Sequence, residues 1–208
     1  IAVRNDAGAW ETIGFETAEL TGPSTYRLTG LLRNLEASAE GTPAIATAGN
    51  PVLVLDGRVV SHGISSDRIG TELDLVAYAG AGDPEGTALG LPIGMDLAIP
   101  LAPCHLDARR DPLSGDIVIS FIRRSRVGAD GWAATEVPLD FSPQAYRVTI
   151  ATGLGDVRVF DVASRMLTYS AADQIADFGT LPGAFDFTVA QTSPVYGSGH
   201  AALGHFFA

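Results

Sequence analysis

Phe-Asp-Phe-Thr-Val-Ala at residues 185–190 and Ala-Tyr-Arg-Val-Thr-Ile at residues 145–150 carry the clearest structural signal in this sequence. Successive side chains of a β-strand point to opposite faces, so each stretch gathers its apolar side chains on one face. These are Phe185, Phe187 and Val189 in one stretch and Tyr146, Val148 and Ile150 in the other. Two such faces can close on each other, which predicts a β-sandwich.

Three neighbouring stretches extend this prediction. Residues 116–122 and 157–162 are rich in Val, Ile and Phe, and residues 105–109 are expected to pair with 116–122. One short helix is also indicated, because Ser170 has the character of an N-cap and Gly179 that of the residue just past a helix end. The second half of the chain is therefore predicted to be a sandwich that carries one two-turn helix.

The first half reads as a set of β-hairpins. Val-Leu-Val-Leu, Asp56-Gly57 and Arg-Val-Val follow one another within residues 52–60, and Asp-Gly readily takes the positive φ angles of a type I′ turn. Residues 19–29 hold two strand-like stretches around Gly-Pro-Ser, which predicts a second hairpin. Residues 72–78 alternate as a half-buried strand does.

A proline-rich stretch separates the two halves. Residues 90–103 contain three prolines, which remove backbone donors and disfavour helix. Residues 79–86 before it are rich in glycine but lack the spacing of a phosphate-binding loop, so they are expected to be a solvated loop. The predicted organisation is a β-rich fragment at residues 1–95 followed by a sandwich at residues 96–208, an all-β chain.

Composition excludes several classes of protein. The 208 residues are 46% hydrophobic and 18% charged, a composition that favours a folded chain. The net charge of −11 disfavours nucleic acid as a partner. A single cysteine excludes an intrachain disulfide, and no apolar run is long enough to span a membrane. The first residue is Ile, so the sequence is expected to be a piece of a longer protein.

No catalytic or metal site is expected. Histidines 62, 105, 200 and 205 lack the spacing of a metal site on one element, and no cofactor motif is present. Ser198 and His200 lie outside any nucleophile-elbow pattern. Asp173 and Asp177 could do acid–base chemistry, but on a short helix they are expected to face water and favour the helix dipole.

One cluster of cations stands out as a possible interface: Arg109, Arg110, Arg123, Arg124 and Arg126. If residues 105–109 and 116–122 pair, these guanidinium groups are expected to gather near one end. They would then bind an anionic partner, such as an acidic neighbouring subunit or a polysaccharide, or form a solvated edge that pairs with Asp107, Asp111 and Asp116. Trp10 and Trp132 are expected to cover core edges rather than to form sugar platforms.

Several strings resemble the large multidomain tail-tip or baseplate proteins of siphophages and gene transfer agents, sometimes called megatron proteins. WETIGFETAELTGPSTYRLTGLLRN, VLVLDG and PLAPCHLDARRD resemble segments of that family in chain order, although Asn34 stands where the family usually has Gly. The string DIVISFIRRSRVGADGWAATEVPLDF is similar to its Trp-Ile-Arg-Arg region, with Phe121 in the place of Trp. SAADQIADFG and FTVAQTSPVYGSG are similar to its helix and penultimate strand.

The resemblance implies a hub-associated β domain, incomplete here, followed by a fibronectin type III-like sandwich. It also implies a virion component at the distal tail, in threefold-symmetric contact with other tail proteins, that serves assembly and host attachment without catalytic residues. Two alternatives remain open from the residues alone. One is an accessory carbohydrate-binding module of a secreted glycosidase, and the other is a hydrolase using Ser198 and His200 or an acid pair.

Overall fold

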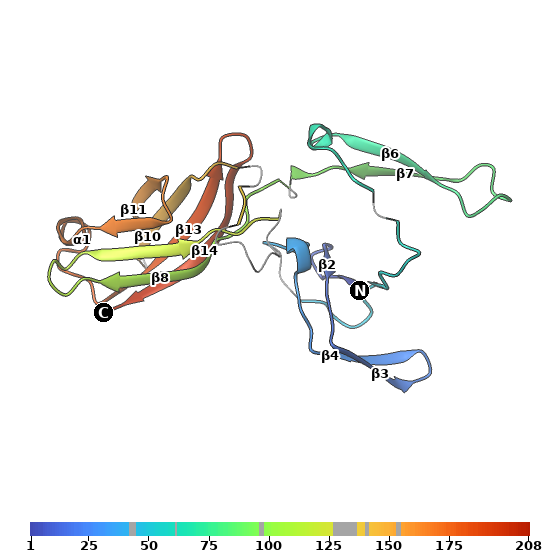
Figure 1. Cartoon of the computed structure of the whole chain (residues 1–208), viewed down its shortest axis with the longest axis horizontal. Helices are drawn as coiled ribbons and strands as arrows, with labels where there is room; N and C mark the ends of the chain where they lie inside the picture. The colour runs from blue at the N-terminus through green and yellow to red at the C-terminus, as the bar shows by residue number, and fades with distance from the viewer. Residues whose placement is uncertain (42–44, 61, 96–97, 127–136, 140–141, 153–154) are drawn as a thin grey trace.

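The computed structural model describes residues 1–41, 45–60, 62–95, 98–126, 137–139, 142–152 and 155–208. Within these residues the chain is all-β with one α-helix, as the sequence predicts. Figure 1 shows a two-layered body formed by the second half of the chain and two hairpins of the first half that extend away from it. Within the described residues, no helix has the length and apolar character needed to span a membrane.

The second half is a sandwich of two antiparallel sheets. One sheet has the order β11-β10-β13-β14 and the other the order β12-β9-β8. Its strands are β8 (Cys104–Arg110), β9 (Ile117–Ile122), β10 (Tyr146–Thr152), β11 (Gly155–Val162), β12 (Met166–Tyr169), β13 (Ala184–Ser193) and β14 (Gly197–Phe207). Three strands facing four in this order is the topology of a fibronectin type III-like sandwich.

The side chains predicted to point inward do fill the space between these sheets. The buried core consists of Ile117, Ile119, Phe121, Tyr146, Val148, Ile150, Leu167, Tyr169, Phe185, Phe187, Val189 and Phe206. Phe121 and Tyr146 join the two sheets through an edge-to-face contact with ring centroids 4.8 Å apart. The sandwich therefore has a continuous core of its own.

Helix α1 (Ala171–Phe178) connects β12 to β13 and begins and ends where the sequence predicts. The Ser170 hydroxyl accepts a hydrogen bond from the Asp173 amide, and Gly179 closes the helix at φ 77°. The buried Gln174 side chain donates to the carbonyls of Gly115 and Tyr169, at 3.1 and 2.8 Å. These bonds hold the helix against the end of the sandwich.

We expect Ser170→Ala to lower the free energy of unfolding by about 1 kcal/mol, because an amide of the first helical turn loses its side-chain acceptor. Urea denaturation followed by circular dichroism measures the change. Ser198→Ala, at an exposed position of β14, is the control. A change at Ser170 no larger than at Ser198 would contradict the role of the cap.

The first half contains three small sheets. Strands β1 (Ala2–Arg4), β2 (Trp10–Thr12) and β5 (Val52–Leu53) form one of them. Strands β3 (Thr17–Gly22) and β4 (Thr25–Thr29) form the hairpin predicted at residues 19–29. Strands β6 (Glu72–Ala77) and β7 (Thr87–Pro92) form another, and two 3₁₀ turns lie at Leu35–Ala37 and Ser66–Arg68.

The hairpin predicted at residues 52–60 is wrong. Val52 and Leu53 pair instead with Val3 and Ala2 of β1, so a long-range partner takes the strand. Gly57 lacks the positive φ that a type I′ turn requires. The Arg58 side chain closes on Asp56 through bonds as short as 2.5 Å. The chain therefore bends at this point without a returning strand.

The proline-rich connection is shorter than predicted, because β7 extends to Pro92 and pairs along its length with β6. Residues 79–86 are the loop of that hairpin, where the Asp83 carboxylate accepts hydrogen bonds from the amides of Ala79 and Gly86. The connection from β7 to β8 buries Ile93, Ala98 and Leu101. The division of the chain at residues 95 and 96 stays a prediction.

Candidate functional site

The two halves of the chain meet at an ion pair between Glu40 and Arg124. Arg124 Nη1 lies 2.9 Å from Glu40 Oε1, and Nη2 lies 3.4 Å from Oε2. The Glu40 side chain is 11% exposed and that of Arg124 34% exposed, so the pair is largely removed from solvent. Arg124 Nη1 also donates to the Ala102 carbonyl at 3.4 Å. This bridge, which we call the joint, links residues 84 positions apart.

A hydrogen-bonded network continues from the joint into the first half. Asn34 Nδ2 donates to Glu40 Oε2 at 2.9 Å, while the Asn34 amide donates to Glu11 Oε1 at 2.9 Å. Glu11, on β2, is almost wholly buried and receives two bonds from Arg33, at 2.9 and 2.5 Å. The joint is thus connected to the small sheet at the N-terminus.

Electrostatics keep both carboxylates of this network ionised. Burial acts to raise the pKa of Glu40, but the charge of Arg124 and the hydrogen bonds from Arg124 and Asn34 outweigh it, so the net effect is a lowered pKa. The hydrogen bonds from Arg33 lower the pKa of Glu11, despite an opposing effect of burial. Both groups therefore carry full negative charge at neutral pH.

A cavity of about 750 Å³ lies beside the joint. Its lining includes Arg123, Arg124 and Arg126 from the segment after β9, together with Cys104 and His105 at the start of β8. Four of its lining residues adopt the left-handed backbone region, which is uncommon for residues other than glycine. They are Asn34 (φ 52°), Glu36 (φ 55°), Ala37 (φ 55°) and His105 (φ 52°).

The sequence predicts that the five arginines gather at one end of the sandwich. In the structure they are divided between its two ends. Strands β8 and β9 are antiparallel, so Arg110 pairs with Ile117 at the start of β9, while Arg123 follows its end. Six residues of extended strand separate these two positions, roughly 20 Å. The prediction failed because β8 and β9 run in opposite directions. The end of β8, with Arg109 and Arg110, therefore lies beside the start of β9, and the arginines that follow the end of β9 lie beside the start of β8.

The three arginines that follow β9, which are Arg123, Arg124 and Arg126, each have a contact within the chain. Arg123 donates to the Val137 carbonyl, and Arg126 Nη1 donates to the Ile99 carbonyl at 2.7 Å. Arg123 is 5% exposed. These three side chains therefore tie together the segments that connect the two halves, a role that sequence spacing does not indicate.

At the opposite end, Arg109 and Arg110 behave differently. Arg109 is exposed and pairs with Asp107 at 2.7 Å, as the solvated-edge alternative predicts. Arg110 Nη2 donates to the Pro182 carbonyl and to Gln174, at 2.7 and 3.1 Å, and the guanidinium lies 5.2 Å from the centre of the Phe206 ring. Asp111 and Asp116 accept backbone hydrogen bonds instead of pairing with arginine.

The helix acids are expected from the sequence to face water, but Asp177 does not. It receives two hydrogen bonds from Arg158, at 2.6 and 2.9 Å, and one from the Tyr169 hydroxyl at 2.6 Å. Arg158 also lies 2.9 Å from Asp173. Burial raises the pKa of Tyr169, and the Asp177 carboxylate raises it further, so the hydroxyl remains a donor. The cluster fixes α1 to β11 and β12.

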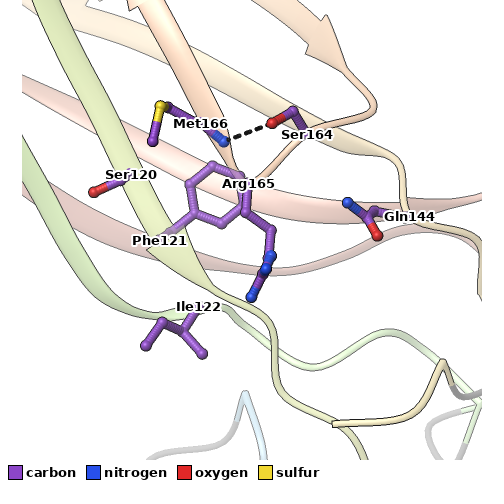
Figure 2. Close-up of a pocket in the computed structure, with 7 residues that line it drawn as sticks. All are labelled: Ser120, Phe121, Ile122, Gln144, Ser164, Arg165 and Met166. Atoms are coloured by element: carbon purple, nitrogen blue, oxygen red, sulfur yellow. Dashed lines mark hydrogen bonds between the residues drawn. The ribbon is translucent and has the colours of Figure 1, made fainter. Parts of the chain in front are cut away.

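Figure 2 shows a second, smaller cavity of about 370 Å³ at the edge of the sandwich. It is lined by Ser120, Phe121, Ile122, Gln144, Ser164, Arg165 and Met166. The one hydrogen bond drawn between them joins the Met166 amide to the Ser164 hydroxyl at 3.2 Å. Arg165 is the only titratable side chain in this lining, so the cavity offers no pair for acid–base chemistry.

The candidate nucleophile and base lie on β14. Ser198 and His200 are two positions apart on the strand, next to an irregularity in its pairing with β13, and no hydrogen bond joins them. The His200 ring instead packs on Gly41, where an added Cβ would lie 2.5 Å from ring atoms. Within the described part of the chain, no group of three or more His, Cys, Asp or Glu residues could hold a metal ion.

Of the two tryptophans, Trp10 begins β2 and is 44% exposed, so it covers the small N-terminal sheet only in part. Trp132 lies outside the described residues. Among the residues that the structure describes, the other exposed aromatic side chains are Phe15, Tyr26, Tyr78 and Phe207. Trp10, Tyr26 and Phe207 lie on three different sheets, and Phe15 and Tyr78 lie outside the strands.

We expect Arg124→Gln to weaken the joint by about 1–2 kcal/mol, because a hydrogen-bonded and partly buried charge is lost. The maximum dimension of the molecule, measured by small-angle X-ray scattering, should increase. Since the folded pKa of Glu40 is lowered, the stabilisation is present above the unfolded value of about 4.3 and is lost as pH falls through the folded value.

The control for this variant is Arg109→Gln, which removes an exposed pair. It should leave the scattering curve unchanged, because exposed ion pairs contribute little. Equal effects of the two substitutions would contradict the role of the joint.

Comparison with known proteins gives a family match to one part of the chain and a structural likeness over most of it. Residues 1–53 match the family described as Rcc01698-like, C-terminal. No curated protein matches the chain. Among solved structures, the chain is similar to domains d3–d4 of the extracellular region of rat CD45. That likeness has 14% sequence identity and a TM-score of 0.36, and it covers 92% of this chain and 94% of that one.

Proposed function

We propose that this chain is a structural component of a phage or phage-like tail tip or baseplate, which contributes to particle assembly and host-cell attachment. The match of residues 1–53 to the Rcc01698-like C-terminal family supports this, since that segment includes residues 10–34, the first of the strings that resemble tail-tip proteins. On this proposal the chain is located in the virion at the distal tail. Its partners are other tail proteins and further copies of itself, expected as a homotrimer.

The observation that carries the proposal is the contrast between the two halves. The sandwich buries a continuous core, whereas the buried hydrophobic residues described in the first 95 positions are Ala2, Ile13, Ala39 and Ile93. Apolar side chains of the first half are instead exposed on β4, β5, β6 and β7 and between them. A half that cannot form its own core is suited to completion by other subunits.

Two observations weigh against the alternatives. A carbohydrate-binding platform needs aromatic rings on one surface, and the exposed rings of Trp10, Tyr26 and Phe207 lie on three different sheets. A hydrolase needs a nucleophile in hydrogen-bond reach of a base, and Ser198 lacks that contact with His200. Of the five arginines, Arg109 is the one most accessible to an anionic partner, with 81% of its side chain exposed, whereas Arg123 is buried.

Immunogold electron microscopy tests the proposal. Antibodies raised against the chain should label the distal end of the tail in particles from the cells that encode it. Label confined to the capsid, or particles that lack the chain, would contradict it. Screening against peptide, ester and glycoside substrates provides a second test, because turnover abolished by Ser198→Ala or His200→Ala would favour a hydrolase instead.

A further inference from the structure

The two hairpins of the first half have the same unusual property. No residue of β3, β4, β6 or β7 is buried. Figure 1 shows the β3–β4 and β6–β7 hairpins apart from each other and from the sandwich, so neither is covered by the rest of the chain. An isolated two-stranded hairpin is marginally stable in water at best. Each hairpin therefore needs a surface to pack on.

The β3–β4 hairpin has one polar face, whose side chains pair with each other, and one apolar face that is exposed. Cross-strand pairing places Ala18 opposite Leu28 and Leu20 opposite Tyr26 on the apolar face, where Leu20 and Tyr26 are each 62% exposed. On the other face, the Thr17 and Thr29 hydroxyls are hydrogen-bonded, and Glu19 lies 3.6 Å from Arg27. The polar face is thus satisfied within the hairpin.

The β6–β7 hairpin repeats this arrangement. Leu73 is paired with Leu91 and Leu75 with Leu89, so four leucines share one face. Leu89 is 57% and Leu91 40% exposed. The opposite face carries the acidic residues of β6. The two apolar faces are similar in length, since their strands have five or six residues.

The chain exposes more surface than a compact monomer of its size. A compact monomer of 21.6 kDa exposes about 9,200 Å², whereas this chain exposes 13304 Å². The excess of about 4,000 Å² is spread over the whole chain, and it is larger than the ~1,600 Å² that a standard interface buries in total. Neither apolar face carries a charged residue, which allows copies of a chain with net charge −11 to approach each other through them.

We infer that the apolar face of β3–β4 in one copy packs on the apolar face of β6–β7 in the next copy. Each chain then offers one face of each kind, so the contact is head-to-tail and closes into a ring when the rotation between copies allows it. This inference rests on the proposed assembly function and names the surfaces that would perform it. The occupant of each face is a second copy of this chain.

Sedimentation velocity of the purified chain and its variants tests the arrangement. The wild-type chain should sediment as an oligomer, and Leu20→Glu and Leu89→Glu should each convert it to a monomer. The controls Thr29→Glu and Ala88→Glu place the same charge on the opposite faces of the two hairpins and should leave the oligomer intact. Circular dichroism confirms that each variant remains folded.

A mixing experiment makes the test specific for head-to-tail contact. A Leu20→Glu chain keeps an intact β6–β7 face, and a Leu89→Glu chain keeps an intact β3–β4 face. Mixed together, the two variants should form a pair of one chain of each kind and nothing larger. If each hairpin instead packed on its own counterpart, each variant would keep one intact contact and would still form a dimer on its own, which would overturn the inference.

The remaining outcomes separate this inference from the proposed function. A wild-type chain that stays monomeric at all accessible concentrations overturns the inference. A wild-type oligomer that both glutamate variants preserve also overturns it, while leaving an assembly role in place. Immunogold label away from the tail contradicts the proposed function, whatever the hairpins do.

Discussion

Phe187→Ala is expected to lower the free energy of unfolding of the sandwich by about 3–5 kcal/mol, the largest effect of a single truncation that this fold suggests. Phe187 is 1% exposed, lies on β13 and contacts Phe185 with ring centroids 6.3 Å apart. Its ring also packs directly on Gly204 of β14, where an added Cβ would lie 2.4 Å from Cζ. Truncation leaves a cavity that rigid strands on both sides cannot close.

Urea denaturation, followed by amide hydrogen exchange in β10 and β13, measures the loss. Leu203→Ala is the matched control, because Leu203 is a large apolar residue on a neighbouring strand with 61% of its surface exposed. It should change stability by well under about 1 kcal/mol, since exposed positions contribute little. A loss at Phe187 no greater than at Leu203 would contradict the assignment of the core.

The second large effect is expected at Glu11. Glu11→Gln keeps the shape of the side chain but removes the charge that accepts two bonds from Arg33 and one from the Asn34 amide. We expect a loss of about 2–3 kcal/mol, less than for a fully buried pair, because Arg33 remains partly exposed. Hydrogen exchange of the amides in β1 and β2 reports the loss.

The pH dependence of this effect has a defined sign. The folded pKa of Glu11 is lowered, so its stabilisation is present above the unfolded value of about 4.3 and is lost as pH falls through the folded value. The difference between wild type and Glu11→Gln should therefore shrink in acid. Glu19→Gln, which removes an exposed pair with Arg27, should change stability little at any pH. A constant difference across acid pH would contradict the ionised state of Glu11.

The sandwich could be predicted from sequence because its strands bury one face, which imposes an alternation visible in six residues. Helix α1 could also be predicted, because Ser170 and Gly179 mark its two ends. The sequence pattern predicts neither β12 nor β14, and the glycines of β14 resemble strand breakers. Gly204 and Gly199 are needed there for another reason, since Phe187 and the Pro100 carbonyl approach them too closely for a Cβ.

The rest of the structure depends on contacts between distant residues. The strong local turn signal at Asp56-Gly57 failed because β1 captures Val52 and Leu53. The joint between Glu40 and Arg124 joins positions 84 apart, and no local pattern marks either residue. The sequence shows the cluster of five arginines, but their separation to two ends of the sandwich depends on the antiparallel direction of β8 and β9.

Electron cryomicroscopy of the assembled particle tests whether this chain is a repeated subunit of the tail tip. We expect several equivalent copies of this chain around the tail axis at the distal end, with the β3–β4 and β6–β7 hairpins buried between subunits. A single off-axis copy per tail, or several copies whose hairpins remain exposed to solvent, would contradict it.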